Sequence, residues 1–163
     1  MNNQAVEAEI KRAVSIAILH SSGKFLMQLR DDIPGIAYPG QWGLFGGHVE
    51  PGESPEEAME RELFEEISYI PPTITKFGEY EDSQVIRHVY HGPLIVDLQE
   101  LVLQEGWDMG LLTPEDIRRG SCFSQKAGKE QPLGRPHQQI LLNFVKKEFR
   151  SQESGVSKIS IGI

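Results

Sequence analysis

The stretch GLFGGHVEPGESPEEAMERELFEEISY, residues 43–69, combines two adjacent glycines with a high density of carboxylates. Its middle contains the signals of a helix start. Ser54 is a favoured N-cap, Pro55 suits the first turn, and Glu57 occupies the position that a capping box requires. We therefore predict a helix that begins after Ser54, runs to about Ile67 and stops before the two prolines at 71 and 72.

Three glutamates of this predicted helix fall on one face. Glu62, Glu65 and Glu66 are three and four residues apart, which places them within an arc of roughly 100°. A solvated acidic face is one explanation, but Ala58 and Met59 lie one turn earlier on the same face, so we expect it to look toward the protein. Carboxylates about 4 Å apart repel by about 4 kcal/mol at an effective dielectric of about 20. Protonation of one carboxylate would relieve this repulsion. A divalent cation bound by these hard oxygen ligands would also offset it, and we favour this second possibility.

The same residues resemble the Nudix box. That pattern is Gly, five residues, Glu, seven residues, Arg-Glu, an apolar residue, any residue, Glu-Glu, any residue, Gly and an apolar residue. Here Gly47 is followed by Glu53 after five residues, and Arg61 opens the charged group after seven more. Every charged position matches through Tyr69, and Ser68 stands where the family has glycine. Because serine is costly in the left-handed conformation, we expect Ser68 to have a negative φ and the prolines to enforce the helix stop.

The resemblance implies roles for individual residues. The metal-binding set that it implies is Gly47, through its carbonyl, with Glu62, Glu65 and Glu66. Glu53 would support this site. Arg61 would orient a carboxylate of the loop and helix, although a surface salt bridge is the ordinary alternative. In the distal segment LVLQEGWDMGLLTPEDI, Glu105 is the candidate for an extra carboxylate, with an ordinary loop acid as the alternative.

The activity implied by the resemblance is Mg²⁺- or Mn²⁺-dependent hydrolysis of the diphosphate bond in nucleoside diphosphate derivatives. A carboxylate would take the proton from water, and the sequence leaves Glu62 and Glu105 both open for this role. The segment QWGLFGGHVEPGES is most similar to members that act on (d)NTPs or oxidised guanine nucleotides. A GDP-mannose or other nucleotide-sugar (ADP-ribose) hydrolase is the first alternative. A non-catalytic nucleotide-binding module is the second, although such proteins usually have a broken glutamate set.

Aromatic residues near the predicted loop and the distal segment are candidates for holding a base or sugar, because flat rings stack well. They are Tyr38, Trp42 and Trp107. Packing in the core or in a loop is the alternative for each of them.

The rest of the chain indicates an α/β protein. The resemblance implies the family's α/β/α sandwich, with a mixed β-sheet between helices. From the residue patterns we expect a hairpin of strands at 13–20 and 23–30, a long loop at 31–43, strands in 73–82, 84–92 and 93–101, a short helix from Thr113, and an amphipathic closing helix at 135–149.

Size and composition set further limits. A chain of 163 residues suits one domain over 1–163, with 151–163 as a tail that forms an added strand or an intersubunit arm. The formal charge of −8 argues against a nucleic-acid polymer as partner, and a phosphorylated small molecule would need a cation between it and the protein. No apolar run reaches the roughly 20 residues that span a bilayer, and the first residues lack a secretory signal, so we expect a cytoplasmic protein and allow for a homodimer. Cys122 is interpreted as a free thiol without chemistry.

Overall fold

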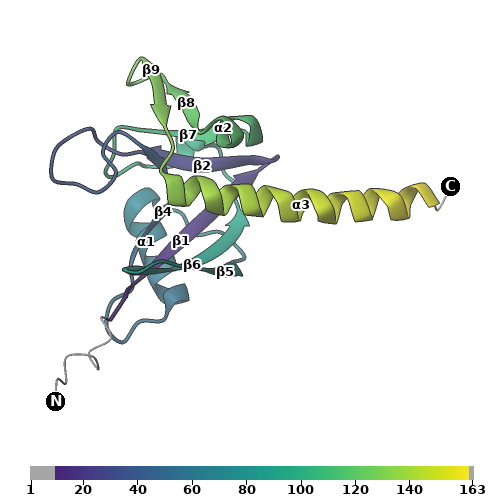
Figure 1. Cartoon of the computed structure of the whole chain (residues 1–163), viewed down its shortest axis with the longest axis horizontal. Coiled ribbons are helices and arrows are strands. Elements are labelled where there is room, and N and C mark those ends of the chain that lie inside the picture. Colours follow the sequence, from purple (N-terminus) through teal and green to yellow (C-terminus); the bar gives the residue numbers. More distant parts are fainter. Residues whose placement is uncertain (1–9, 162–163) are drawn as a thin grey trace. The chain divides into compact units, whose positions relative to one another are not determined.

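The protein is described by a computed structural model that covers residues 10–161, with side chains to residue 148. The chain forms two compact units, whose helices and strands are labelled in Figure 1. The first is built from the residues up to Leu19 and from Phe45–Gln104, and the second from His20–Leu44 and the residues from Glu105 onward. The organisation as one domain stays a prediction.

The first unit contains the predicted box helix and the strands that hold it. Strand β1 (Arg12–Ser21) pairs antiparallel with β4 (Phe45–His48) and lies next to β6 (Val85–Pro93) in the sheet order, and β6 pairs antiparallel with β5 (Thr75–Glu81). Helix α1 (Pro55–Ile67) packs against β4. The buried side of α1 carries Ala58, Met59, Leu63 and Ile67. Burial of these apolar side chains fixes which face of α1 looks toward the strands.

Both ends of α1 lie where the sequence predicts them, but the exit conformation was predicted wrongly. At the start, Ser54 Oγ accepts from the Glu57 amide at 3.1 Å, as expected for a capping box. At the end, Ser68 has φ 54° and ψ 36°, which is left-handed, and its amide donates to the Phe64 carbonyl at 3.0 Å. Packing of the next residue explains this turn. Tyr69 is buried and its hydroxyl donates to the Pro93 carbonyl at 2.7 Å, so the chain reverses at Ser68 despite the cost for a serine.

The second unit begins with the predicted hairpin, which is confirmed. The end of β1 pairs antiparallel with β2 (Lys24–Leu29), and His20 lies opposite Phe25. The turn residues Ser22 and Gly23 have φ of 51° and 78°. Two consecutive left-handed residues match the twist of a tight two-residue hairpin.

The remaining elements of the second unit surround β2. Strands β3 (Trp42–Gly43) and β7 (Asp108–Leu112) both pair antiparallel with β2. Helix α2 (Pro114–Arg119) confirms the predicted short helix and is capped by Thr113. Strands β8 (Ser121–Ser124) and β9 (Lys129–Pro132), together with β7, were not predicted from the sequence. The α/β class with a mixed sheet and helices is confirmed.

The strand predicted at 93–101 is wrong. This segment leaves β6 at Pro93 and forms a 3₁₀ turn, η2 (Leu98–Glu100). The Asp97 amide donates to the Glu100 carboxylate at 2.9 Å, and the Glu100 amide donates to the Asp97 carbonyl at 2.9 Å. These local side-chain and backbone bonds compete with a strand ladder, and periodicity does not reveal them.

Helix α3 (Arg135–Ile161) confirms the predicted closing helix and extends it. The added strand expected in the tail is therefore wrong as far as Ile161, because no proline interrupts the helical pattern after 149. Residues 162 and 163 of that tail lie outside the described residues, and the intersubunit arm stays a prediction. None of the helices within the described residues is long and apolar enough to cross a membrane.

Candidate functional site

The two glycines of β4 let the strand lie close to its neighbours in the first unit. Gly47 pairs with Ser15 of β1, and Gly46 pairs with Ile16. A Cβ on Gly46 would overlap the backbone of Ser15. A Cβ on Gly47 would clash with all three atoms of the Glu62 carboxyl group, of which Oε2 is the farthest at 2.7 Å. The absence of side chains at Gly46 and Gly47 therefore allows a carboxylate of α1 to lie directly on the strand backbone.

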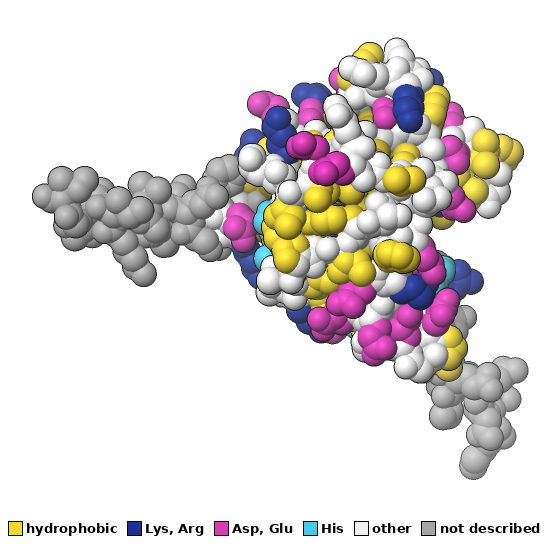
Figure 2. Space-filling view, turned by 180° about the vertical axis from the view of Figure 1, so that it is seen from behind, with side chains coloured by type: hydrophobic (Ala, Val, Ile, Leu, Met, Phe, Trp, Pro, Cys, Tyr) yellow, Lys and Arg dark blue, Asp and Glu magenta, His cyan; other side chains and the backbone are white. Residues whose placement is uncertain are grey.

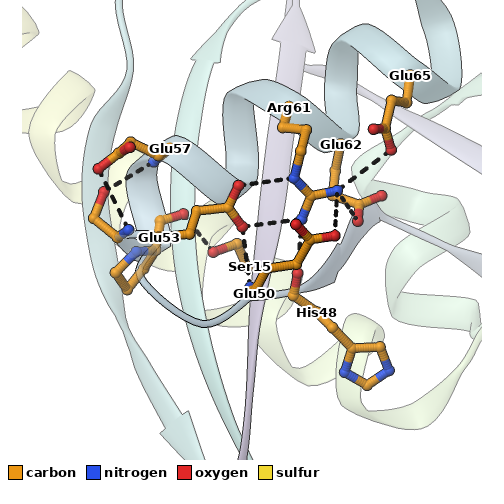
Figure 3. Close-up of polar contacts among 10 residues, drawn as sticks. Ser15, His48, Glu50, Glu53, Glu57, Arg61, Glu62 and Glu65 are labelled. Carbon is orange, nitrogen blue, oxygen red and sulfur yellow. Dashed lines mark hydrogen bonds and ion pairs between the residues drawn. The ribbon is translucent and has the colours of Figure 1, made fainter.

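Arg61 is the centre of a cluster of carboxylates (Figure 3). Its Nε and Nη2 donate to the two oxygens of Glu53 at 2.8 and 3.0 Å, which is a bidentate pair. Its Nη1 donates to Glu62 Oε1 at 3.0 Å and to Glu65 Oε2 at 3.3 Å. Nη2 also donates to the His48 carbonyl at 3.0 Å, while the His48 ring points away from the cluster. Arg61 thus ties the strand end, the loop and the helix together.

The carboxylates differ in how they are held. The Glu66 carboxylate accepts from the Gly46 amide at 3.3 Å, so it is directed at the glycine pair. The Glu53 carboxylate also accepts from the Glu50 amide at 3.1 Å, which fixes it within the loop. Glu62 is largely covered, with 17% of its side chain exposed, whereas Glu65 is 57% exposed. The Glu53 side chain is covered to a similar extent, with 15% exposed, but its hydrogen bonds with Arg61 outweigh the loss of water. Burial has its largest effect on Glu62.

The electrostatic environment follows from these contacts. Burial raises the pKa of Glu62, although its hydrogen bond with Arg61 opposes the shift. The hydrogen bond from Arg61 lowers the pKa of Glu53, and the Glu50 amide lowers it further. The same pairing with Glu53 raises the pKa of Arg61, so the guanidinium stays charged. The cluster therefore holds one permanent cation among acids, one of which is partly desolvated.

The donor set fits a hard divalent cation by its chemistry. Among the side chains from residue 10 to 148, no three Asp, Glu, His or Cys groups already converge on one point in the way of a metal cage. Glu62 and Glu65 turn toward Arg61 instead. Even so, carboxylate and carbonyl oxygens are the ligands that Mg²⁺ and Mn²⁺ prefer. A cation held by the Gly47 carbonyl and Glu62 would also offset the cost of burying the Glu62 charge.

The other predicted site residues lie in the second unit. Glu105 is exposed and precedes β7. Tyr38 is 41% exposed with φ 54°, and its ring meets the His137 ring edge-on at 6.3 Å. Trp42 is only 2% exposed and its Nε1 donates to the Cys122 carbonyl at 3.1 Å, which favours packing as its role. Trp107 is half-buried, and its amide donates to the Leu29 carbonyl at 2.8 Å.

Two contributors to the cluster are not predicted from the sequence. Glu50 lies 3.7 Å from Arg61 Nη1, and the His48 carbonyl accepts from Arg61. The carbonyl has no sequence signal, because any residue supplies one. Glu50 belongs to the same acidic loop as Glu53, and its charge was the available clue.

On the face drawn in Figure 2, the described Asp and Glu side chains are widely spread, with no broad basic patch between them.

The whole-chain pattern agrees with the local geometry. The model of the NUDIX domain matches residues 9–130, and the chain therefore belongs to the Nudix family. The box helix, the glycine pair and Arg61 all lie within this match.

Individual relatives match over shorter lengths. A Bacillus subtilis (strain 168) protein with the provisional name 8-oxo-dGTP diphosphatase is 36% identical over 81 residues, which cover 48% of this chain and 50% of that protein. Nucleoside triphosphatase NudI of Escherichia coli O1:K1 / APEC is 42% identical over 57 residues, covering 35% and 40%. The chain thus spans half or less of the curated relatives it matches. The crystal structure of a MutT protein from Methanosarcina mazei Go1 has a TM-score of 0.61 at 23% identity, covers 85% of this chain and 94% of its own, and shows the shared fold.

Proposed function

We propose that this protein is a Mg²⁺- or Mn²⁺-dependent pyrophosphohydrolase that cleaves a diphosphate bond of nucleoside triphosphates. The observation that carries the proposal is the arrangement around Arg61, which holds Glu53, Glu62 and Glu65 while Glu62 lies against bare Gly47. Family membership and relatives named as a diphosphatase and a triphosphatase support it.

The proposed metal ligands are the Gly47 carbonyl, Glu62, Glu65 and Glu66. When bound there, a divalent cation would neutralise phosphate charge and lower the pKa of a water molecule. Arg61 donates to both Glu53 and Glu62, which limits how far these carboxylates can move. The Gly46 amide does the same for Glu66.

Proton transfer is assigned to a carboxylate. Glu62 is one candidate base, because burial raises its pKa toward the range in which a carboxylate accepts a proton efficiently. Glu105 is the other candidate base, and neither residue is preferred over the other for this role. Comparing the pH dependence of kcat in Glu62→Gln and Glu105→Gln distinguishes them, since loss of the base removes the acidic limb of the profile.

Within the proposed class, oxidised guanine nucleotides and ordinary (d)NTPs are the first substrates to examine, in line with the relatives' names. Tyr38 and Trp107 are the better candidates for contact with the base, since Trp42 is buried. GDP-mannose and ADP-ribose remain the alternative substrates. Binding without cleavage would indicate the non-catalytic alternative.

The test is a panel of (d)NTPs, 8-oxo-dGTP, GDP-mannose and ADP-ribose with Mg²⁺ or Mn²⁺, with products resolved by chromatography. We expect a nucleoside monophosphate and pyrophosphate from the triphosphates. No turnover of any member of the panel would contradict the proposal.

A matched pair of variants ties that activity to the cluster. Glu65→Gln or Glu66→Gln should abolish turnover without unfolding, because an amide is a poor substitute for a charged ligand. Glu60→Gln changes the same kind of side chain at an exposed position of α1 and should keep full turnover. A wild-type rate in either cluster variant would contradict the metal assignment.

The remaining predictions concern the surroundings of the protein. A nucleoside diphosphate-type small molecule is its proposed partner, and a cytoplasmic location and a homodimer stay predictions. Size-exclusion chromatography with light scattering tests the assembly.

A further inference from the structure

Ser15 is a fully buried polar residue in the middle of the apolar strand β1. None of its surface is exposed. Its Oγ donates to the carbonyl of Pro55, the first residue of α1, at 2.5 Å (Figure 3). Replacing it with an apolar residue would satisfy the strand pattern equally well, so the hydroxyl calls for a reason beyond core packing.

The other side of Ser15 faces the glycine pair. Ser15 lies opposite Gly47 in the β1–β4 register, and its backbone carbonyl occupies the place where a Cβ on Gly46 would be. One residue therefore contacts both the strand that carries the glycine pair and the start of the carboxylate helix.

The bond is not needed to form the helix itself. A carbonyl has two lone pairs, so the Pro55 carbonyl can accept from the helix backbone and from Ser15 together. The bond instead connects α1 to β1. A second connection, from the Gly46 amide to Glu66, lies 11 residues further along the helix, or about 16 Å at about 1.5 Å per residue. One connection is to β1 and the other to β4, so together they fix both the axial position and the rotation of α1 against this pair of strands.

We propose that Ser15 is a positioning residue that sets where Glu62 and Glu66 lie relative to Gly47, and thereby sets the affinity for the divalent cation. The inference rests on the proposed function. Metal sites tolerate displacements of only a few tenths of an ångström, and residues that orient ligands typically change affinity by about 10–100-fold. Ser15 acts on the whole helix rather than on one ligand, so we expect the lower end of that range.

The test is Mn²⁺ binding measured directly by electron paramagnetic resonance, without substrate, together with the melting temperature of the metal-free protein. Ser15→Ala should weaken Mn²⁺ binding about tenfold. Ser124→Ala is the matched control. Ser124 is 1% exposed, donates to Asp108 at 2.6 Å and accepts from the Ala127 amide at 3.1 Å. The Ser124→Ala variant should have a lower melting temperature than the wild type but a Mn²⁺ affinity within about twofold of it.

The outcomes are separable. Unchanged Mn²⁺ affinity in Ser15→Ala, or an equal loss in Ser124→Ala, overturns the positioning role while leaving the proposed function intact. Absence of Mn²⁺ binding in the wild-type protein overturns both. If Ser15→Ala does not fold, Ser15→Cys fills the same place with a much weaker donor and must show the same loss of affinity, or the inference is refuted.

Discussion

The left-handed serine at the end of α1 offers a quantitative test of backbone strain. Ser68 has φ 54° and ψ 36°, its side chain is exposed, and its amide is bonded to the Phe64 carbonyl. A glycine can adopt the same conformation without a Cβ clash and keep the same backbone bond. Ser68→Gly should therefore stabilise the protein.

The size of the gain is a difference of two terms. Relief of the left-handed strain contributes about 1–2 kcal/mol. Glycine also adds freedom to the unfolded chain, which costs about 0.5–1 kcal/mol. Subtracting the middle of the second range from the middle of the first gives a net gain of about 0.75 kcal/mol, which corresponds to a rise of about 1.5–3 °C in the melting temperature for a chain of this size.

Urea midpoints and calorimetry measure the effect, with two calibrating variants. Ser68→Ala keeps the Cβ and the strain, so its stability should lie within about 0.5 kcal/mol of wild type. Gly128 has φ 71° and open space where a Cβ would lie, so Gly128→Ala reverses the same two terms without a steric clash and should destabilise by about 0.75 kcal/mol. If Ser68→Gly is neutral or destabilising while Gly128→Ala shows the expected loss, the strain argument for Ser68 is refuted.

Three further predictions use the site and the thiol. Mg²⁺ at about 100 times its dissociation constant should stabilise the native state by about 2.7 kcal/mol and so raise the melting temperature, and this rise should be absent in Glu66→Gln. An unchanged melting curve of the wild-type protein with Mg²⁺ would argue against a preformed site. The pKa of Glu62 is raised in the folded state, so its charge destabilises the metal-free fold as pH rises above the ordinary value of 4.5. Metal-free Glu62→Gln should therefore be more stable than the wild type at about pH 7, and this advantage should disappear below pH 4.5. A lower stability of the variant at neutral pH would contradict this prediction. Burial raises the pKa of Cys122 to about 11, with Asp116 adding to the shift, so the native thiol should react with Ellman's reagent at about pH 8 far more slowly than the unfolded chain, and equal rates would refute its burial.

Much of the site could be predicted because its signals are local. The start of α1 depends on Ser54, Pro55 and Glu57, which lie within four residues of each other, and the structure confirms the capping box. The spacing of the glutamates fixes their common face by helix geometry alone. The partners of Arg61 were anticipated only in kind, since a carboxylate of the loop was expected and Glu53 is bidentate there.

Long-range packing decided what the sequence left open or predicted wrongly. Ser68 is left-handed because Tyr69 is buried and bonded to Pro93, 24 residues further along the chain. The 3₁₀ turn after Pro93 is an exception, because the bonds between Asp97 and Glu100 that form it are local and the periodicity of the segment does not reveal them. A helix cap or a spacing of charges is set by neighbours within one turn, and the sequence determined those. The exit from α1, the burial of Trp42 and the contact between Ser15 and Pro55 depend on residues brought together from distant positions, and only the tertiary structure decided them.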